Sequence, residues 1–193
     1  MATDRAGELG IPEKMQLLHR ALRAAGIAHA FGGALALAWC IREVRATMDI
    51  DVNVFVAVAR RDDVLAAMPD GVRWDDVAVA ALDRDGQARL FWGRHPVDVF
   101  LNTTAFHEQA ARRVRFEPLL DDELPFLACA DLAVFKAFFS RGKDWVDLGN
   151  MLDEGSFEVA DVAGVLATHL GPDDERIDRL LRLARGPRRG REP

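Results

Sequence analysis

The amino-acid sequence predicts an α/β (α+β) fold, in which a small mixed sheet flanked by helices is followed by a C-terminal helical part. Two observations predict the sheet. Residues 47–56 (TMDIDVNVFV) and 96–102 (PVDVFLN) alternate apolar and polar side chains, the period of a half-buried strand. A third predicts the helical part: from Leu124 onward apolar residues recur at helical spacing, and no further strand is needed.

The remaining elements follow in order along the chain. Apolar recurrence predicts a first helix over 12–26, with Pro12 at its start and Gly26 at its end. AHAFGG (28–33) predicts a short strand that ends in paired glycines. We further expect helices at 34–43, 60–68 and 104–113, strands at 88–93 and 114–119, and C-terminal helices at 128–140, 144–153, 158–169 and 173–185.

This order of elements places a boundary near residues 119–124. We expect a core with its N-terminal helix over 1–120 and a helical part over 121–185. The last residues, 186–193 (GPRRGREP), are predicted to be a disordered tail.

Composition limits the classes of protein that the chain can belong to. Half of the 193 residues are hydrophobic, enough for a globular core. The formal net charge of −6 argues against a protein that coats nucleic acid through bulk charge, although it allows a local basic patch.

Segment composition predicts a cytoplasmic protein without a membrane partner. No segment has the apolar length of a membrane span, and the N-terminus MATDRAGELG lacks the order of a signal peptide. Cys40 and Cys129 lie in or beside apolar helical stretches, so we expect buried thiols rather than a disulfide.

Three aspartates stand on predicted strands with apolar opposite faces. Asp49 and Asp51 are two residues apart and project from one face, with Cα atoms about 6.6 Å apart. Two such carboxylates can reach one magnesium ion, which takes hard oxygen ligands at about 2.1 Å. Asp98 on a neighbouring strand would complete the cluster. The alternative is that each carboxylate only decorates a solvated sheet face.

A glycine pair precedes these carboxylates. Gly32 and Gly33 end a strand and begin a helix, which would leave free backbone N–H groups for a phosphate beside a positive helix end. Arg45 and Thr47 then lead into the strand of Asp49. Phosphate cradle, cationic side chain and paired carboxylates occur in the order that a magnesium–triphosphate site needs, although glycine pairs also form ordinary turns.

These motifs resemble those of a known family. FGGALAL followed by RATMDIDV looks like the signature of the nucleotidyltransferase (DNA polymerase beta-like) superfamily, and is similar to the AbiEii-type branch of bacterial toxins. HPVDVFLN matches the third-carboxylate strand, and FKAFFSRGKDWVDLGNML resembles the branch's lysine-plus-KD-plus-D helical motif. The resemblance covers about residues 28–153. Many members carry serine where this chain has Ala34, so no hydroxyl is available there.

The resemblance implies a metal-dependent nucleotidyltransferase with two magnesium ions and a nucleoside triphosphate as co-substrate. It implies metal-ligand roles for Asp49, Asp51 and Asp98, a triphosphate contact for Lys136, and a distal site wall of Lys143, Asp144 and Asp147. Residue chemistry leaves alternatives open. Lys136, in an apolar helix, can extend to solvent instead. Lys143 and Asp147 can be a surface helix pair, and Asp144 only a helix-start residue.

For the biological role, the resemblance implies the toxin of a toxin–antitoxin pair that modifies RNA such as the tRNA acceptor end, with a cognate antitoxin protein as a partner. One rival is an enzyme that adenylylates a small molecule such as an antibiotic. Another is a binding or regulatory protein that kept the fold and lost activity.

Several other residues are candidates with simpler explanations. His95 is expected in an exposed turn, and the tryptophans in the core, although Trp145 is placed to stack on a base. Basic residues recur along the last helix and tail, either as a solvated face or as an RNA-binding track. They are Arg176, Arg179, Arg182, Arg185, Arg188, Arg189 and Arg191.

Overall fold

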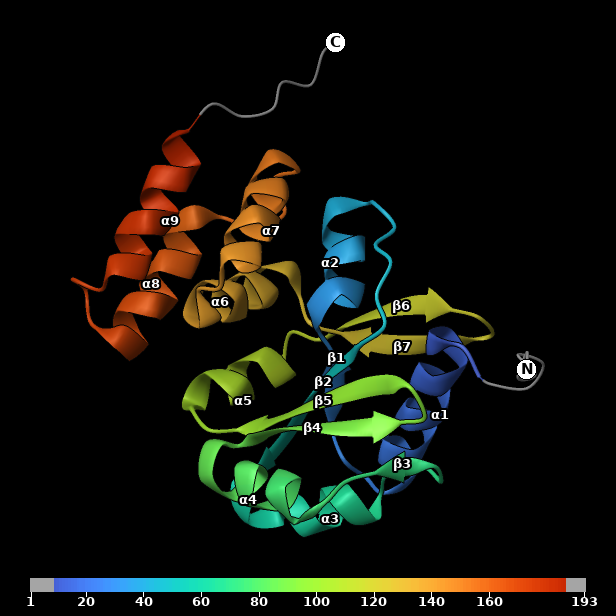
Figure 1. Ribbon diagram of the computed structural model, residues 1–193. Coiled ribbons are helices and arrows are strands. Elements are labelled where there is room, and N and C mark those ends of the chain that lie inside the picture. Colours follow the sequence, from blue (N-terminus) through green and yellow to red (C-terminus); the bar gives the residue numbers. More distant parts are fainter. Residues whose placement is uncertain (1–8, 187–193) are drawn as a thin grey trace, which may run out of the picture. The chain divides into compact units, whose positions relative to one another are not determined.

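The computed structural model describes residues 9–186 of the chain, which fall into two compact units (Figure 1). The first comprises the described residues up to Gly32 and residues 46–127; the second comprises residues 33–45 and the described residues from Ala128 onward. The chain therefore passes between the units three times. The tail expected to be disordered lies outside the described residues except for Gly186, and so do Arg188, Arg189 and Arg191.

The first unit is built on a seven-stranded sheet in the order β3-β4-β5-β2-β1-β7-β6. β2 pairs in parallel with β5 and β1 with β7, while the other neighbours are antiparallel. This mixed sheet confirms the predicted fold class. The strands are β1 (His29–Phe31), β2 (Ile50–Ala57), β3 (Val72–Arg73), β4 (Gln87–Trp92), β5 (His95–Asn102), β6 (Arg115–Leu119) and β7 (Asp122–Phe126).

One face of the central strands is apolar and buried, which explains the alternation seen in the sequence. The side chains of this face are almost fully excluded from solvent because helices cover them. They include Ile50, Val52, Val54, Leu90, Val97, Val99 and Leu101. The opposite face carries the polar residues of the same strands, and the candidate carboxylates lie on it.

The helices of the first unit are α1 (Ile11–Ala24), α3 (Arg61–Ala66), α4 (Asp76–Asp85) and α5 (Ala105–Ala111), with the 3-10 turn η1 (Val58–Arg60). α1 buries Met15, Leu18 and Leu22, whose spacing places them on one face of the helix. α3 and α4 pack against β2 and β4, and Figure 1 shows them together on one side of β4 and β5. Neither α4 nor the two-residue strand β3 was predicted from the sequence.

A second correction concerns residues 122–126. We expected no strand from Leu124 onward, yet β7 pairs with both β6 and β1. Leu124, Pro125 and Phe126 are all buried. Because neither face of this segment meets solvent, it lacks the alternation that reveals a strand in a sequence.

The described part of the second unit contains only helices. They are α2 (Gly33–Ile41), α6 (Cys129–Phe139), α7 (Gly142–Asp153), α8 (Val159–Leu170) and α9 (Glu175–Arg185). α2 packs against α6 and α7, and α9 contacts α6, α7 and α8. Ile177 and Leu180 of α9 are buried, so the last helix belongs to this core. Among all helices described over residues 9–186, none has the length and apolarity to cross a membrane.

The expectation of two free thiols is wrong. Cys40 at the end of α2 and Cys129 at the start of α6 form a disulfide, with sulfur atoms 2.11 Å apart and a sequence separation of 89. Both residues are buried, as expected. Two cysteines this far apart in sequence become neighbours only because α2 packs on α6. Since disulfides are uncommon in reducing compartments, the cysteines no longer support a cytoplasmic location, which stays a prediction.

Candidate active site

Two of the predicted carboxylates lie side by side on the sheet of the first unit. In the parallel pairing of β2 with β5, Asp51 is the register partner of Asp98. Register partners on adjacent strands project from the same face, so both carboxylates lie on the face opposite the buried valines. The pairing that the sequence analysis expected for the strands of Asp51 and Asp98 is therefore present.

Asp49 occupies a different local structure from the one expected. β2 begins at Ile50, and residues before it do not continue the strand. The Asp49 N–H donates to the Thr47 hydroxyl oxygen at 3.1 Å, which forms a local turn. Thr47 is thus a turn residue that fixes the backbone of Asp49, while its predicted role in phosphate binding stays a prediction.

A residue that the sequence analysis missed, Arg89 of β4, lies against these carboxylates. Its Nε and Nη2 atoms donate to the two oxygens of Asp98, both at 2.7 Å. Nη2 is also 3.5 Å from an oxygen of Asp49. These hydrogen bonds to Asp98 raise the pKa of Arg89 above its usual value.

The sequence contained a signal for this contact. β4 and β5 form a hairpin in which Trp92 pairs with His95 across Gly93 and Arg94. Counting outward from this two-residue turn places Arg89 opposite Asp98. Without a fixed turn length the register stays open, and a shift by one residue would turn Arg89 to the other face.

The donor chemistry of this cluster suits a divalent cation. Asp49, Asp51 and Asp98 supply the hard oxygen ligands that magnesium prefers, and Nη2 of Arg89 lies 2.7 Å from Asp98 and 3.5 Å from Asp49. In the part of the chain that the structure describes, no three acidic, histidine or cysteine side chains are arranged to hold a metal ion. The residue types suit magnesium, but Arg89 contacts Asp49 and Asp98, and the three carboxylates are not arranged as a metal site.

Gly32 and Gly33, the predicted phosphate cradle, differ in their backbone hydrogen bonding and conformation. The Gly32 N–H donates to the Asp51 carbonyl at 2.9 Å, so the expectation of a free N–H at this position is wrong. A Cβ at Gly32 would lie 2.9 Å from the Asn53 amide nitrogen, which explains the absence of a side chain. Gly33, the first residue of α2, has a φ of +58°, a conformation that glycine adopts without strain.

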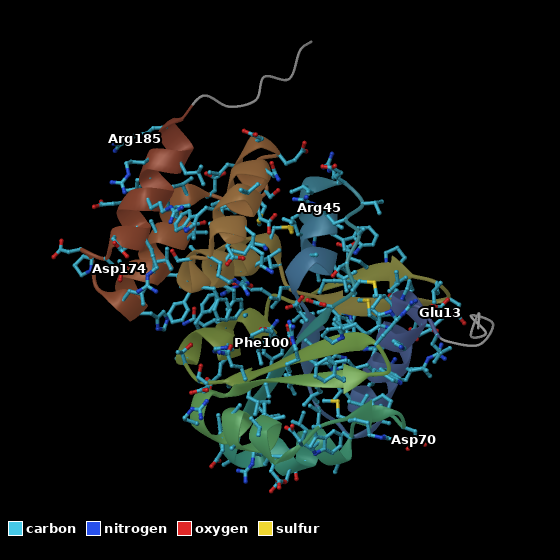
Figure 2. All side chains as sticks on the ribbon, viewed as in Figure 1. Glu13, Arg45, Asp70, Phe100, Asp174 and Arg185 are labelled. Atoms are coloured by element: carbon cyan, nitrogen blue, oxygen red, sulfur yellow. A yellow bond between two sulfur atoms is a disulfide. The ribbon has the colours of Figure 1, made fainter. Side chains whose placement is uncertain are left out.

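In the second unit, four predicted residues form one ion cluster. Lys136 of α6 donates to Asp147 of α7 at 2.7 Å, and Arg45 donates to the other oxygen of Asp147 at 3.0 Å. Lys136 also lies 3.8 Å from Asp144. Lys136 is 6% exposed, so it does not extend to solvent. Figure 2 labels Arg45, in the segment that follows α2.

Of the two simpler alternatives, the helix-start role of Asp144 is present, whereas the surface pair of Lys143 with Asp147 is not. Lys143 is exposed on the first turn of α7 and does not share the cluster, since Asp147 is held by Lys136 and Arg45. Asp144 is fully buried and accepts hydrogen bonds from the backbone and side chain of Arg141. This capping box makes Asp144 a helix-start residue, and Asp144 also lies within ion-pair distance of Lys136.

His95 is not in an exposed turn, as we had expected. It is 3% exposed and begins β5. Lys14 of α1, also buried, donates to the Trp92 carbonyl at 2.9 Å and lies 2.7 Å from His95 Nδ1. Because lysine can only donate, His95 Nδ1 accepts, and the pair serves the packing of α1 on the sheet.

The tryptophans and the arginine series are only partly as expected. Trp92 and Trp145 are buried, whereas Trp39 and Trp74 are partly exposed. Arg179 lies over the Trp145 ring, 4.5 Å from its centre, so an arginine occupies one face of the ring that was a candidate for base stacking. Figure 2 shows the span of α9 between Asp174 and Arg185.

Within α9, Arg176 is held by two charge-assisted contacts. It pairs with Asp174 at 2.7 Å and donates to the Phe138 carbonyl at 3.0 Å. Arg179 and Arg182, with Arg176, line a small hollow of about 100 Å³. Arg176 and Arg179 of α9 thus make contacts within their own unit, and the RNA-binding track stays a prediction.

Comparison with models of protein families finds no match, and comparison with curated proteins finds none either. Solved structures do match. The antibiotic-resistance factor ANT(2'')-Ia aligns with a TM-score of 0.52 and 13% sequence identity, over 90% of this chain and 90% of that chain. At this identity the likeness concerns the fold alone: the chain shares the fold of that protein.

Two further solved structures align less well. One is a nucleotidyltransferase-like protein from Paracoccidioides brasiliensis, with a TM-score of 0.44, 12% identity, and coverage of 89% of this chain and 92% of that chain. The other is JHP933 from Helicobacter pylori, with a TM-score of 0.44, 13% identity, and coverage of 89% and 86%.

Proposed function

We propose that this chain is a metal-dependent nucleotidyltransferase, which transfers a nucleoside monophosphate from a nucleoside triphosphate to an acceptor and releases pyrophosphate. The observation that carries the proposal is the pairing of Asp51 with Asp98, beside Asp49, on the polar face of a sheet with this type of fold. The motifs at residues 28–153 resemble the same superfamily.

In the proposed reaction an acceptor oxygen attacks the α-phosphorus, the bond from that phosphorus to the bridging oxygen breaks, and pyrophosphate leaves. Asp49, Asp51 and Asp98 would hold one or two magnesium ions, which neutralise the charge that develops on the phosphate oxygens. Asp98 would also accept the proton of the attacking group. The sheet supplies the preorganisation, because strand pairing fixes the backbone of Asp51 and Asp98.

We propose further that the triphosphate is bound by the predicted residues Gly33, Arg45, Thr47, Lys136, Lys143 and Asp147; Gly32 is left out because its N–H is bonded to Asp51. The charge balance of the second unit supports this role for Lys136 and Arg45. Lys136, Arg45 and Arg141 contact Asp144 and Asp147, so these contacts join three cations to two carboxylates. An excess of cations favours an anion, and the side chains of Arg45 and Arg141 are exposed enough to meet one.

For the acceptor, we propose RNA such as the tRNA acceptor end, in the role of a toxin with a cognate antitoxin. The support is the resemblance of FKAFFSRGKDWVDLGNML to the AbiEii-type motif. A small-molecule acceptor is the second candidate, because the aligned ANT(2'')-Ia is an antibiotic-resistance factor and the match spans 90% of each chain.

The test is incubation of the protein with each labelled nucleoside triphosphate, magnesium and either total tRNA or a panel of antibiotics. Label in the RNA band supports the first acceptor, and label in a small product supports the second. The Asp51→Asn variant is the control, because its fold should persist while its label transfer should not. Transfer by this variant at the wild-type rate would refute the carboxylate assignment.

A binding protein that kept the fold and lost activity is distinguished by a separate measurement. A triphosphate bound with magnesium by the native state should raise the melting temperature by mass action. If none of the four triphosphates at millimolar concentration shifts the melting temperature and no label is transferred, the proposed enzyme activity is wrong.

A further inference from the structure

We propose that Arg89 is an internal counter-ion of the catalytic carboxylates, which competes with the divalent cation for Asp98 and Asp49 and so lowers the metal affinity of the site. The inference rests on the proposed function, since it assigns the same carboxylates to the metal. It adds a residue that regulates this site and that belongs to none of the motifs of the family resemblance.

The contact of Arg89 with Asp98 is specific. The guanidinium meets the carboxylate with two parallel hydrogen bonds, from Nε and Nη2, both at 2.7 Å. This bidentate arrangement is the strongest that arginine makes with a carboxylate. Both oxygens of Asp98 are thereby engaged.

The register of the sheet imposes this contact. Arg89 is opposite Asp98 across β4 and β5, and Asp98 is opposite Asp51 across β5 and β2. The three residues therefore form one row across adjacent strands on the same face. A cationic side chain at this position of β4 therefore lies close to the carboxylates. Arg89 is attracted electrostatically by Asp49 and Asp51 as well as by Asp98.

The Arg89 guanidinium and a divalent cation cannot both bind Asp98 closely, because both are positively charged. Three neighbouring carboxylates repel one another, and a nearby cation relieves that repulsion. A divalent ion at about 2.1 Å from a carboxylate oxygen would stand close to a guanidinium bound to the same group, and the two cations would repel. Arg89 must therefore loosen its hold on Asp98 before the carboxylate can serve as a metal ligand.

The side chain of Arg89 is able to make this movement without unfolding the sheet. It is 51% exposed, whereas Asp98 is 19% exposed. Its backbone is fixed by pairing with β5, but the guanidinium reaches solvent through rotation of its side-chain bonds alone. Half-exposure also limits the strength of the pair, so the competition should be modest rather than prohibitive.

Manganese binding without nucleotide tests the proposal directly. Free Mn²⁺ is measured by electron paramagnetic resonance during titration of wild-type protein, Arg89→Gln, Arg89→Lys and Arg84→Gln. Arg84 is a matched control, because it is an exposed arginine of the same unit that pairs with Asp85 at 2.5 Å. We expect Arg89→Gln to bind Mn²⁺ about fivefold more tightly than wild type, the upper range for an exposed pair. Arg89→Lys should lie between them because lysine lacks the bidentate fork, and Arg84→Gln should equal wild type.

The outcomes separate this inference from the proposed function. If Arg89→Gln and wild type bind Mn²⁺ equally, or the variant binds more weakly, the counter-ion role is refuted while metal binding by the carboxylates stands. If no protein in the series binds Mn²⁺, both proposals fail. Circular dichroism checks the fold of each variant. If Arg89→Gln does not fold, the comparison of Arg89→Lys with wild type tests the inference alone. An unchanged Mn²⁺ affinity of Arg89→Lys would then refute it.

Discussion

Replacing Asp147 with alanine would remove the carboxylate that holds Lys136 at 2.7 Å and Arg45 at 3.0 Å. Replacing Lys136 with methionine would remove one cation from the same cluster but keep most of its aliphatic stem. The two substitutions break the same ion pair, yet the structure predicts unequal losses of stability. The difference lies in what each variant leaves behind.

The Asp147→Ala variant leaves a cation without its main partner, since the Lys136 side chain is 8% exposed. Removing one partner of a buried pair costs about 3–5 kcal/mol. Asp144 at 3.8 Å still attracts Lys136, and Asp147 is itself 17% exposed, so we expect about 2–3 kcal/mol. In Lys136→Met, Asp147 keeps Arg45 and Asp144 keeps Arg141, so the loss should stay below about 1 kcal/mol.

Urea unfolding measures both losses. Trp145 is buried on α7, the helix that carries Asp147, and its fluorescence reports on this unit. The double variant should lose less stability than Asp147→Ala alone, because no unpaired lysine remains in it. If Lys136→Met were as destabilising as Asp147→Ala, the explanation by an uncompensated buried cation would be wrong. Triphosphate binding by the stable Lys136→Met variant then tests the functional role of the lysine separately.

Four further predictions concern other parts of the molecule. Asp51→Asn should lower nucleotide transfer by more than about a hundredfold without lowering the melting temperature, because it removes a proposed metal ligand and not a core contact; a loss of both would indicate a structural role. Gly33→Val should weaken triphosphate binding in calorimetry, since φ is +58° there and valine is strained in that conformation; unchanged affinity would move the phosphate site elsewhere. Burial lowers the pKa of His29 from 6.5 to about 4, so the unfolded chain takes up a proton first as the pH falls. The free energy of unfolding should therefore decline by about 3 kcal/mol between pH 6.5 and pH 4, and His29→Gln should make this decline smaller. An equal decline in the variant and the wild type would refute the assignment to His29. The unreduced, denatured protein should show no free thiol, and reduction of Cys40–Cys129, which are 89 residues apart, should lower stability by up to about 4–5 kcal/mol; two titratable thiols before reduction would contradict the disulfide.

Much of the fold was predictable because its signals are local. β2 and β5 alternate, since one face of each is buried and the other carries polar groups. The C-terminal helices were predicted within a few residues of their ends. The missed elements lacked such signals: β3 has only two residues, and β7 is buried at three consecutive positions.

The candidate site in the first unit was predictable only in part. Asp51 and Asp98 were found because each alternates with apolar residues on its own strand, and the register of β2 with β5 then places them together. Arg89 was missed because its position depends on the hairpin register. The expectation for Gly32 failed because strand pairing with Asp51 uses its N–H.

The sequence by itself determined which residues face a core and which carry charge at strand positions, because burial of one face imposes a period on the chain. Only the tertiary structure decided which distant residues are neighbours. It paired Cys40 with Cys129, buried Lys136 against Asp147, and set Arg89 against Asp98. Such contacts depend on strand register and helix packing between segments far apart in the chain, and the periodicity of neither segment contains that information.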